Sequence, residues 1–326
     1  MLLVSMASAW SANGHMYVSN IAYNVLTDKA PSSLAKAEKL MKYLGEYNST
    51  FVQYEDKHAF VESATFADDF KYHGEMWQSD FHFFKNPWIE EGSESDYDVD
   101  YREKNLTIAL NDITAWLSGK KGTTYKHHYL YTFLMKKFDN DENVAKSYAL
   151  RLLIHYMGDL LQPFHCETRY NKEFSDGDKG ANAFPLKNHY GVDELHALWD
   201  RILYDGKDNI DRPFTDDTWD AFQVSVNQVM SNYSYAVDGV SVYKSTNFDK
   251  WAGESYDIAI QLYEGLTESA AVPQDYLDKW HPTAYERLII GGYRLYYVID
   301  YIFKDQNEVQ SDGDMIDEDW FDQWVS

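Results

Sequence analysis

Residues 144–165, VAKSYALRLLIHYMGDLLQPFH, carry the clearest structural signal of this 326-residue chain. Apolar residues recur there at steps of three and four up to Leu161, which is the spacing of an α-helix. His155 and Asp159 lie four residues apart, so they project from the same face of that helix. Pro163 ends the helix, and the turn that follows re-aims His165, which would otherwise project from a different face.

The same periodicity extends over most of the chain, and few segments alternate as strands do. It predicts helices over residues 18–44 with a break at Pro31, 107–117, 127–138, 144–161, 192–203, 218–235, 251–266 and 284–303. Breaks fall at 92–100, 119–122, 139–142 and 176–180. No internal repeat or shift of composition marks a boundary. We therefore expect an all-α fold, a single mostly helical domain with long loops over residues 10–304.

The composition of the chain bears on which classes of function are possible. Hydrophobic residues make up 44% of the chain, which is enough for a sizeable core. The formal net charge of −24 repels polyanions, so stable duplex binding is not expected. A small anionic substrate stays compatible, because bound metal ions would reverse the field locally. No apolar run approaches the ~18 residues of a transmembrane helix.

The two ends of the chain carry their own signals. Residues 1–9 form a short apolar segment ending in Ala7-Ser8-Ala9, an A-x-A cleavage pattern before Trp10, and we interpret it as a short or truncated signal segment. Glycosylation sequons begin at Asn48, Asn105 and Asn232. We expect a secreted protein or one in an endomembrane, lysosome-like compartment. The single cysteine allows no internal disulfide, and residues 305–326 form an acidic tail.

A second pair at helical spacing, His196 with Asp200, repeats the pattern of the first. Imidazole and carboxylate suit Zn²⁺ and differ from the thiolate sets of structural zinc modules. The two pairs, together with His165, therefore favour a catalytic metal centre.

Five segments extend this pattern in order along the chain. They are WSANGH (10–15), FAD (66–68), DFH (80–82), HYMGDLLQPFH (155–165) and LHALWD (195–200). Read together, they resemble the zinc-dependent single-strand nucleases of the S1/P1 nuclease family, which includes class I plant nucleases and trypanosomatid 3′-nucleotidase/nucleases. Further matches at WAGES (251–255) and GGYRL (291–295) extend the resemblance over nearly the whole chain. The resemblance implies the fold of the zinc phospholipase C/nuclease superfamily.

The resemblance also implies three zinc ions per chain. Asp68, His82, His155 and Asp159 would hold the first ion. His165, His196 and Asp200 would hold the second. The third would be bound by His15, by Asp159 as a bridge, and by Trp10 through its α-amine and carbonyl oxygen. The amine can bind only after cleavage behind Ala9, because an acylated nitrogen has no lone pair to donate.

The activity implied by the resemblance is hydrolysis of single-stranded DNA and RNA to 5′-nucleotides, with 3′-nucleotidase activity. A hydroxide bridging two zincs would attack phosphorus. Lys71, where the family usually has Arg, would hold a phosphate oxygen, and Lys71 and Asp159 are the catalytic candidates. Phe83 would stack on the nucleobase, and Asn182 in the loop 180–182 would bind the base or cap a turn. We expect a monomer.

One position departs from the family pattern in a way that bears on catalysis. Lys85 stands where the family usually places an Asp that orients the attacking water, so Asp80 or Asp69 would substitute, or zinc alone would orient it. Glu194 replaces a usual Asn. Two alternatives therefore stay open: a related zinc phospholipase C, and a zinc-binding homologue that is catalytically impaired.

Overall fold

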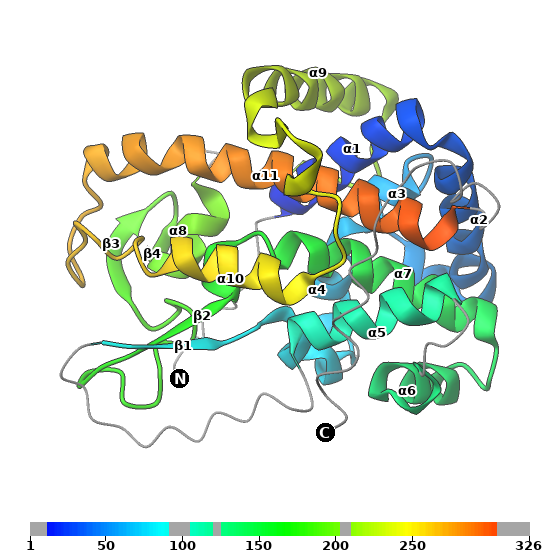
Figure 1. Cartoon of the computed structure of the whole chain (residues 1–326), viewed down its shortest axis with the longest axis horizontal. Helices are drawn as coiled ribbons and strands as arrows, with labels where there is room; N and C mark the ends of the chain where they lie inside the picture. Colours follow the sequence, from blue (N-terminus) through cyan, green and yellow to red (C-terminus); the bar gives the residue numbers. More distant parts are fainter. Residues whose placement is uncertain (1–11, 91–104, 120–124, 203–209, 305–326) are drawn as a thin grey trace.

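The computed structural model describes residues 12–90, 105–119, 125–202 and 210–304. Helix α7 (Glu142–Asp159) lies at its centre, and Asp141 begins the helix by accepting the backbone N–H groups of Asn143 and Val144. Fifteen of its 18 residues are buried, as expected of a helix surrounded by others. Its neighbours in Figure 1 are α1 (Ala12–Lys29), α2 (Pro31–Tyr47), α5 (Leu106–Ser118) and α11 (Gln274–Phe303).

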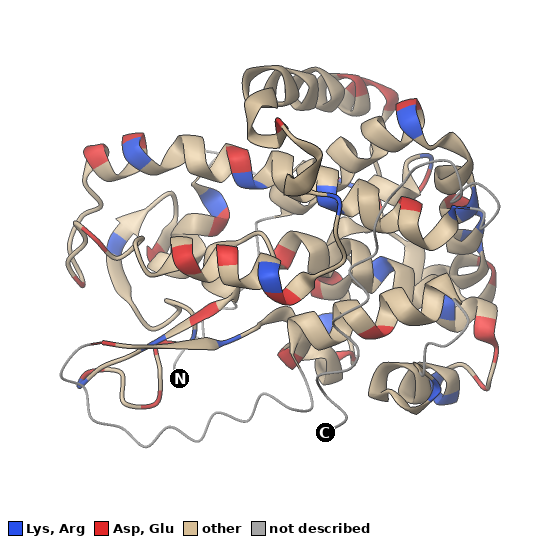
Figure 2. Cartoon of the chain, viewed as in Figure 1, with Lys and Arg blue, Asp and Glu red and all other residues tan. Residues whose placement is uncertain are grey.

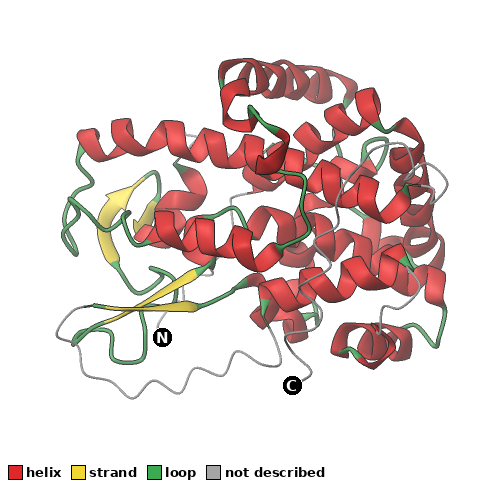
Figure 3. Cartoon of the chain, in the orientation of Figure 1, coloured by secondary structure: helices red, strands yellow, loops and turns green. Residues whose placement is uncertain are grey.

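The remaining elements, most of them shorter, surround this layer of helices. The helices are α3 (Ala59–Glu62), α4 (Phe66–Lys71), α6 (Tyr129–Lys137), α8 (Leu195–Arg201), α9 (Asp216–Asn232) and α10 (Phe248–Ala259). Single 3₁₀ turns join several of them, including η3 (Met76–His82) and η5 (Pro163–His165). Figure 3 shows how few strands the described part contains. The expectation of one mostly helical, all-α domain is confirmed.

The four strands form two small ribbons beside the helices. Strand β1 (Asn86–Ile89) pairs in parallel with β2 (Glu167–Tyr170), and β3 (Pro185–His189) pairs antiparallel with β4 (Val192–Glu194). The β1–β2 ladder begins one step earlier, where the Phe84 N–H donates to the His165 carbonyl at 2.7 Å. This pairing brings two segments about 80 residues apart in the sequence side by side.

Helices α10 and α11 close the carboxyl end of α7. The Ser255 hydroxyl donates to the Leu160 carbonyl at 2.5 Å, and Arg287 Nε donates to the Leu161 carbonyl at 3.2 Å. A helix end leaves its last carbonyls unpaired and partly negative, so a buried hydroxyl and a guanidinium stabilise it there. The turn that follows α7 is therefore held by contacts from a distant part of the chain.

Several predicted boundaries were wrong; for example, α10 ends at Ala259 rather than at residue 266, and α1 begins at Ala12 rather than at residue 18. The segment 192–203 was predicted as one helix, but residues 192–194 form β4, because Tyr190 and Gly191 both take positive φ and turn the chain into a hairpin. Helix α11 starts ten residues before the predicted position and runs through Pro282. Its buried face continues on both sides of the proline, with Tyr276, Leu277 and Trp280 before it, and this packing outweighs the lost hydrogen bond.

Charge is spread over the whole described part of the molecule. Figure 2 shows acidic positions on most helices, with basic positions scattered among them. None of the described helices is long and apolar enough to cross a membrane.

Candidate metal centre

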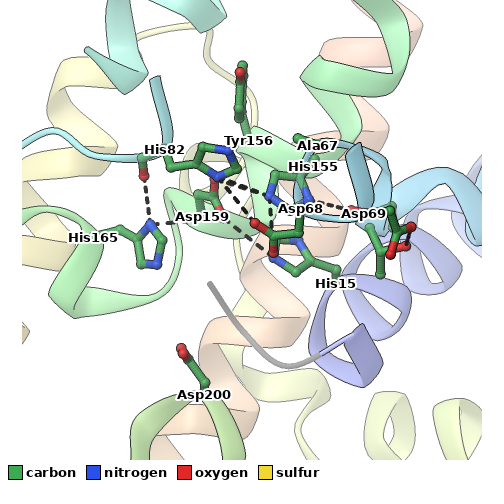
Figure 4. A network of polar contacts seen from close by, with 12 residues as sticks. His15, Ala67, Asp68, Asp69, His82, His155, Tyr156, Asp159, His165 and Asp200 are labelled. Carbon is green, nitrogen blue, oxygen red and sulfur yellow. Dashed lines mark hydrogen bonds and ion pairs between the residues drawn. The ribbon is translucent and has the colours of Figure 1, made fainter. Parts of the chain in front are cut away.

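Eight histidine and aspartate side chains from six elements of the chain meet beside the carboxyl half of α7. They are His15 of α1, Asp68 of α4, His82 at the end of η3, His155 and Asp159 of α7, His165 of η5, and His196 and Asp200 of α8. All but Asp68 are buried. Figure 4 shows His15, His82, His155 and Asp159 pointing toward one another, with His165 and Asp200 to one side.

The ligand atoms of these residues form three groups, each within 4.8 Å. We call Asp68, His82 and His155 the first set; His165, His196 and Asp200 the second set; and His15, His155 and Asp159 the third set. The structure thus brings together the described residues that the sequence pattern singled out. Trp10, the remaining predicted ligand, lies outside the described residues.

Asp159 lies between the first and third sets. Its Oδ2 atom is 2.9 Å from His82 Nδ1 and 3.4 Å from His155 Nε2, whereas Oδ1 is 3.4 Å from His15 Nε2. Each carboxylate oxygen therefore faces a different set. A carboxylate in this position can bridge two cations.

Backbone carbonyls fix the tautomers of three rings. His155 Nδ1 lies 2.7 Å from the Ala64 carbonyl, His165 Nδ1 2.6 Å from that of His82, and His196 Nδ1 2.6 Å from that of Gly180. A carbonyl can only accept, so the hydrogen of each ring is assigned to Nδ1. Each Nε2 atom then carries a lone pair and is an acceptor, which is the arrangement of a metal-ligating histidine.

The donor set fits a bound cation. His196 Nε2 lies 3.2 Å from His165 Nε2, and the tautomers above make both atoms acceptors. Two lone pairs at that distance repel each other in a buried site. Nitrogens bound at about 2.0–2.1 Å to one tetrahedral Zn²⁺ lie about 3.3 Å apart, so a shared ion removes this repulsion.

Unpaired polar atoms support the same conclusion. Within the described residues, neither ring nitrogen of His15 and neither oxygen of Asp159 makes a hydrogen bond, although all four atoms are buried. The 2.9 Å approach of His82 Nδ1 to Asp159 is not aligned as one. Buried polar atoms without partners are costly. A metal ion bound between these groups would satisfy them.

Burial also sets the protonation of the histidines. It lowers the pKa of His15, His82, His155 and His165, assisted at His15, His82 and His165 by neighbouring rings, and lowers that of His196 to about 4. The rings are therefore neutral near pH 7, as ligands must be. Burial raises the pKa of Asp159, with a further contribution from the Asp68 charge. A bound cation would oppose that effect.

Two glycines permit the close packing of the site, and sequence reasoning assigned neither a role. A Cβ on Gly158 would lie 2.4 Å from His15 Nδ1, so only glycine lets the His15 ring lie against α7. A Cβ on Gly180 would lie 2.2 Å from the Phe164 carbonyl, and Gly180 has a φ of +65°. The only sequence signal for Gly158 is a glycine inside a predicted helix.

Lys71, predicted to contact phosphate, lies beside the centre. It is 7% exposed at the end of α4, and it makes no ion pair with a described residue. Its charge contributes to the lowered pKa values of His82, His155, His165 and His196. Lys71 is therefore not an ordinary exposed surface lysine.

The two predicted base-binding residues differ in their surroundings. The Phe83 ring stacks on His165 with centroids 4.6 Å apart and an interplanar angle of 9°. The Phe83 ring is half-buried beside the second set. Asn182 Nδ2 donates to the Lys179 carbonyl at 2.8 Å, so this side chain closes the turn that carries Gly180.

Lys85, where an acid was expected, lies near the Phe83 ring. Its Nζ atom is 5.8 Å from the Phe83 ring centroid and 3.5 Å from Asp80 Oδ1, and both charged side chains are exposed. Asp69, the other candidate substitute, is held by Arg212 at 2.7 and 3.0 Å. Both candidate substitutes are therefore engaged in ion pairs, Asp80 with Lys85 and Asp69 with Arg212.

Comparison with known proteins agrees with this geometry. The sequence model of the S1/P1 nuclease family matches residues 10–304. Endonuclease 1 of Arabidopsis thaliana is 24% identical over 94% of this chain and 91% of its own length. Endonuclease 5 of Arabidopsis thaliana is 22% identical, with coverages of 92% and 93%, and Endonuclease 2 is 24% identical over 72% and 74%.

Proposed function

Since this chain belongs to the S1/P1 nuclease family, we propose that it is a zinc-dependent phosphodiesterase. It hydrolyses single-stranded DNA and RNA to 5′-nucleotides and removes phosphate from 3′-nucleotides. The observation that carries the proposal is the meeting of eight histidine and aspartate side chains in three overlapping ligand sets. The family makes the chain a nuclease-type hydrolase; the metal, its number and the second activity are part of the proposal.

Three zinc ions per chain match the three sets. The first set with Asp159 would hold one ion, and the second set another. His15 and Asp159 would hold the third together with the free amine and carbonyl of Trp10, as the family resemblance implies. Bound zinc supplies a nucleophile at neutral pH and stabilises the charge on the phosphoryl and leaving oxygens.

The side chains of this protein orient both metal and substrate. The carbonyls of Ala64, His82 and Gly180 fix three imidazoles in the ligating tautomer. Lys71, buried and without an ion-pair partner among the described residues, is placed to bind a phosphate oxygen as a point charge. Phe83 offers one face to a base, and stacking accepts every base, so weak sequence preference follows.

The substrate is single-stranded for an electrostatic and a geometric reason. The net charge of −24 disfavours a protein that grips the phosphates of a duplex on an extended surface. A stacking ring beside a buried cationic centre instead requires an unpaired base. Lys85 lies at this ring and replaces an acid, so we propose a slower or altered enzyme rather than an inactive one.

The proposal also covers the cellular location of the protein. The A-x-A pattern at Ala7-Ser8-Ala9 and the need for a free Trp10 amine both favour cleavage of residues 1–9, and hence secretion or an endomembrane compartment. We propose that the processed protein acts as a monomer, with glycans at the sequons.

The test uses protein that begins at Trp10. Zinc per chain is measured by mass spectrometry, and hydrolysis is compared on single-stranded DNA, duplex DNA, a 3′-mononucleotide and phosphatidylcholine. We expect three zincs, cleavage of the single strand in preference to the duplex, and release of phosphate from the mononucleotide. Three zincs without turnover of any substrate would support the impaired homologue, and cleavage of lipid alone would support the phospholipase.

A matched protein with one extra residue before Trp10 tests whether the α-amine of Trp10 binds the third zinc. We expect this protein to bind two zincs and to lose activity, because an acylated nitrogen cannot bind metal. Unchanged zinc content would contradict the assigned third site.

A further inference from the structure

Gln162 joins the turn that carries His165 to the Asp200 carboxylate through a single carboxamide. The residue is fully buried between the end of α7 and the turn that carries His165. Its Oε1 atom accepts the Phe164 N–H at 2.7 Å, and its Nε2 atom donates to Asp200 Oδ1 at 2.8 Å. One contact caps the η5 turn, and the other reaches across to α8.

The orientation of this amide follows from its partners. A backbone N–H can only donate, so the Phe164 contact requires the oxygen of Gln162 on that side. The NH₂ group must then face Asp200 and requires an accepting oxygen there. Because Oδ1 is engaged, Oδ2 of Asp200, 3.8 Å from His196 Nε2, is the oxygen left for a cation.

We infer that Gln162 is a positioning residue for the second metal site, and this inference rests on the proposed function. It holds the His165 turn and the Asp200 carboxylate in one geometry, so that Asp200 binds the ion through Oδ2 alone. Without the amide, the Phe164 N–H and Asp200 Oδ1 would both be buried and unpaired, and the carboxylate could rotate.

Few other side chains can perform both tasks. Glutamate keeps an acceptor for Phe164 but places an oxygen against the carboxylate of Asp200. Asparagine is one methylene shorter and cannot span both contacts. Methionine keeps the length and much of the volume but donates nothing. Comparing these variants therefore separates the hydrogen bonds from the packing.

The main experiment measures zinc release from the processed protein with Gln162→Met. Zinc per chain is followed against a competing chelator, and the Co²⁺-substituted protein is examined by absorption spectroscopy. We expect one of three ions to be released at a chelator concentration about 10- to 100-fold lower than in the wild type. The other two should follow the wild-type curve, and the Co²⁺ spectrum should change.

Gln78→Met is the matched control. Gln78 is also fully buried, its Nε2 atom donates to the Ala67 carbonyl at 2.9 Å, and its Oε1 atom accepts from Tyr156. It contacts no member of the second set, so its loss should lower stability without changing release of the second-set ion. Circular dichroism of both metal-free variants reports whether each has folded.

Two further variants keep the inference testable if Gln162→Met does not fold. Gln162→Glu preserves the cap on Phe164 and changes only the face toward Asp200, so an altered Co²⁺ spectrum is expected. In an Asp200→Asn background, the effect of Gln162→Met on zinc release should shrink, because the two residues act through one contact.

The outcomes separate this inference from the proposed function. The positioning role is overturned if Gln162→Met leaves zinc release unchanged or weakens the binding of all three ions equally. It is also overturned if the effects of Gln162→Met and Asp200→Asn on zinc release simply add. A wild type that binds zinc but hydrolyses no substrate overturns the proposed function and leaves the role of Gln162 standing.

Discussion

Replacing Gly158 with alanine tests the geometry of the third set directly. The added carbon would lie 2.4 Å from His15 Nδ1, and ordinary contact begins at about 3.4 Å, so the ring must retreat by about 1 Å. Metal–ligand distances tolerate about 0.2 Å. The displacement is therefore several times larger than a bound zinc permits, and His15 should be lost as a ligand.

The stability of the metal-free chain should change far less. Overpacking costs roughly 1–3 kcal/mol, whereas alanine is favoured over glycine inside a helix by about 1 kcal/mol. The two effects partly cancel, and we expect a net loss of about 0–2 kcal/mol without zinc.

Gly253→Ala provides the control, because its added carbon in α10 meets nothing within 4 Å. Chemical denaturation with and without zinc, together with zinc per chain, measures the difference. Gly158→Ala should bind two zincs, and Gly253→Ala should bind three and gain roughly 0.5–1 kcal/mol. A Gly158→Ala protein with three zincs and the stability gain of the control would refute the reasoning.

Three further predictions follow from the site and the core. Protein stripped of metal by a chelator should unfold at a lower temperature than protein in zinc at a hundred times Kd, by the equivalent of about 3 kcal/mol. Adding Zn²⁺, but not Mg²⁺, should restore the midpoint. An unchanged midpoint in calorimetry would contradict a metal site. Lys85→Asp should raise kcat on single-stranded DNA by about tenfold and Lys85→Ala by less, because an acid there can orient water; a fall in both variants would mean that Lys85 itself binds substrate. Burial raises the pKa of Asp112 to about 7, so its contribution to stability is fully present below about pH 4 and is lost as pH rises through about 7. Between pH 5 and pH 8, Asp112→Asn should remove up to about 3 kcal/mol of this loss, reduced by the His128 Nδ1 atom 2.6 Å from Asp112 Oδ1. Chemical denaturation at the two pH values measures it, and an equal loss of stability in both proteins would contradict the prediction.

Much of the helical fold and the membership of the site could be predicted from the sequence. Helical periodicity is local, so it identified α7 and placed His155 beside Asp159. Pro163 predicted the turn before His165, which the structure shows as η5. The boundaries at β4 and α11 were missed, because a hairpin and packing across Pro282 are set by tertiary contacts.

The supporting contacts of the site could not be predicted. The acceptors for the three imidazoles are backbone carbonyls. Every residue has one, so residue type does not predict which carbonyl accepts. The need for glycine at 158 depends on a ring from α1, 143 positions earlier in the chain. Gln162 lies within a predicted turn and gains its role only when α8 packs against it.

The use of main-chain oxygens to fix the imidazoles has a consequence for mutational tolerance. A side chain can be exchanged at Ala64 or His82 without removing the oxygen that holds the neighbouring ring. A substitution at these positions therefore cannot remove the carbonyl that fixes the ring; it can only displace the carbonyl by shifting the backbone. In a deep mutational scan, exchange of Ala64 should affect activity through size alone, so that serine is accepted and bulky residues are rejected.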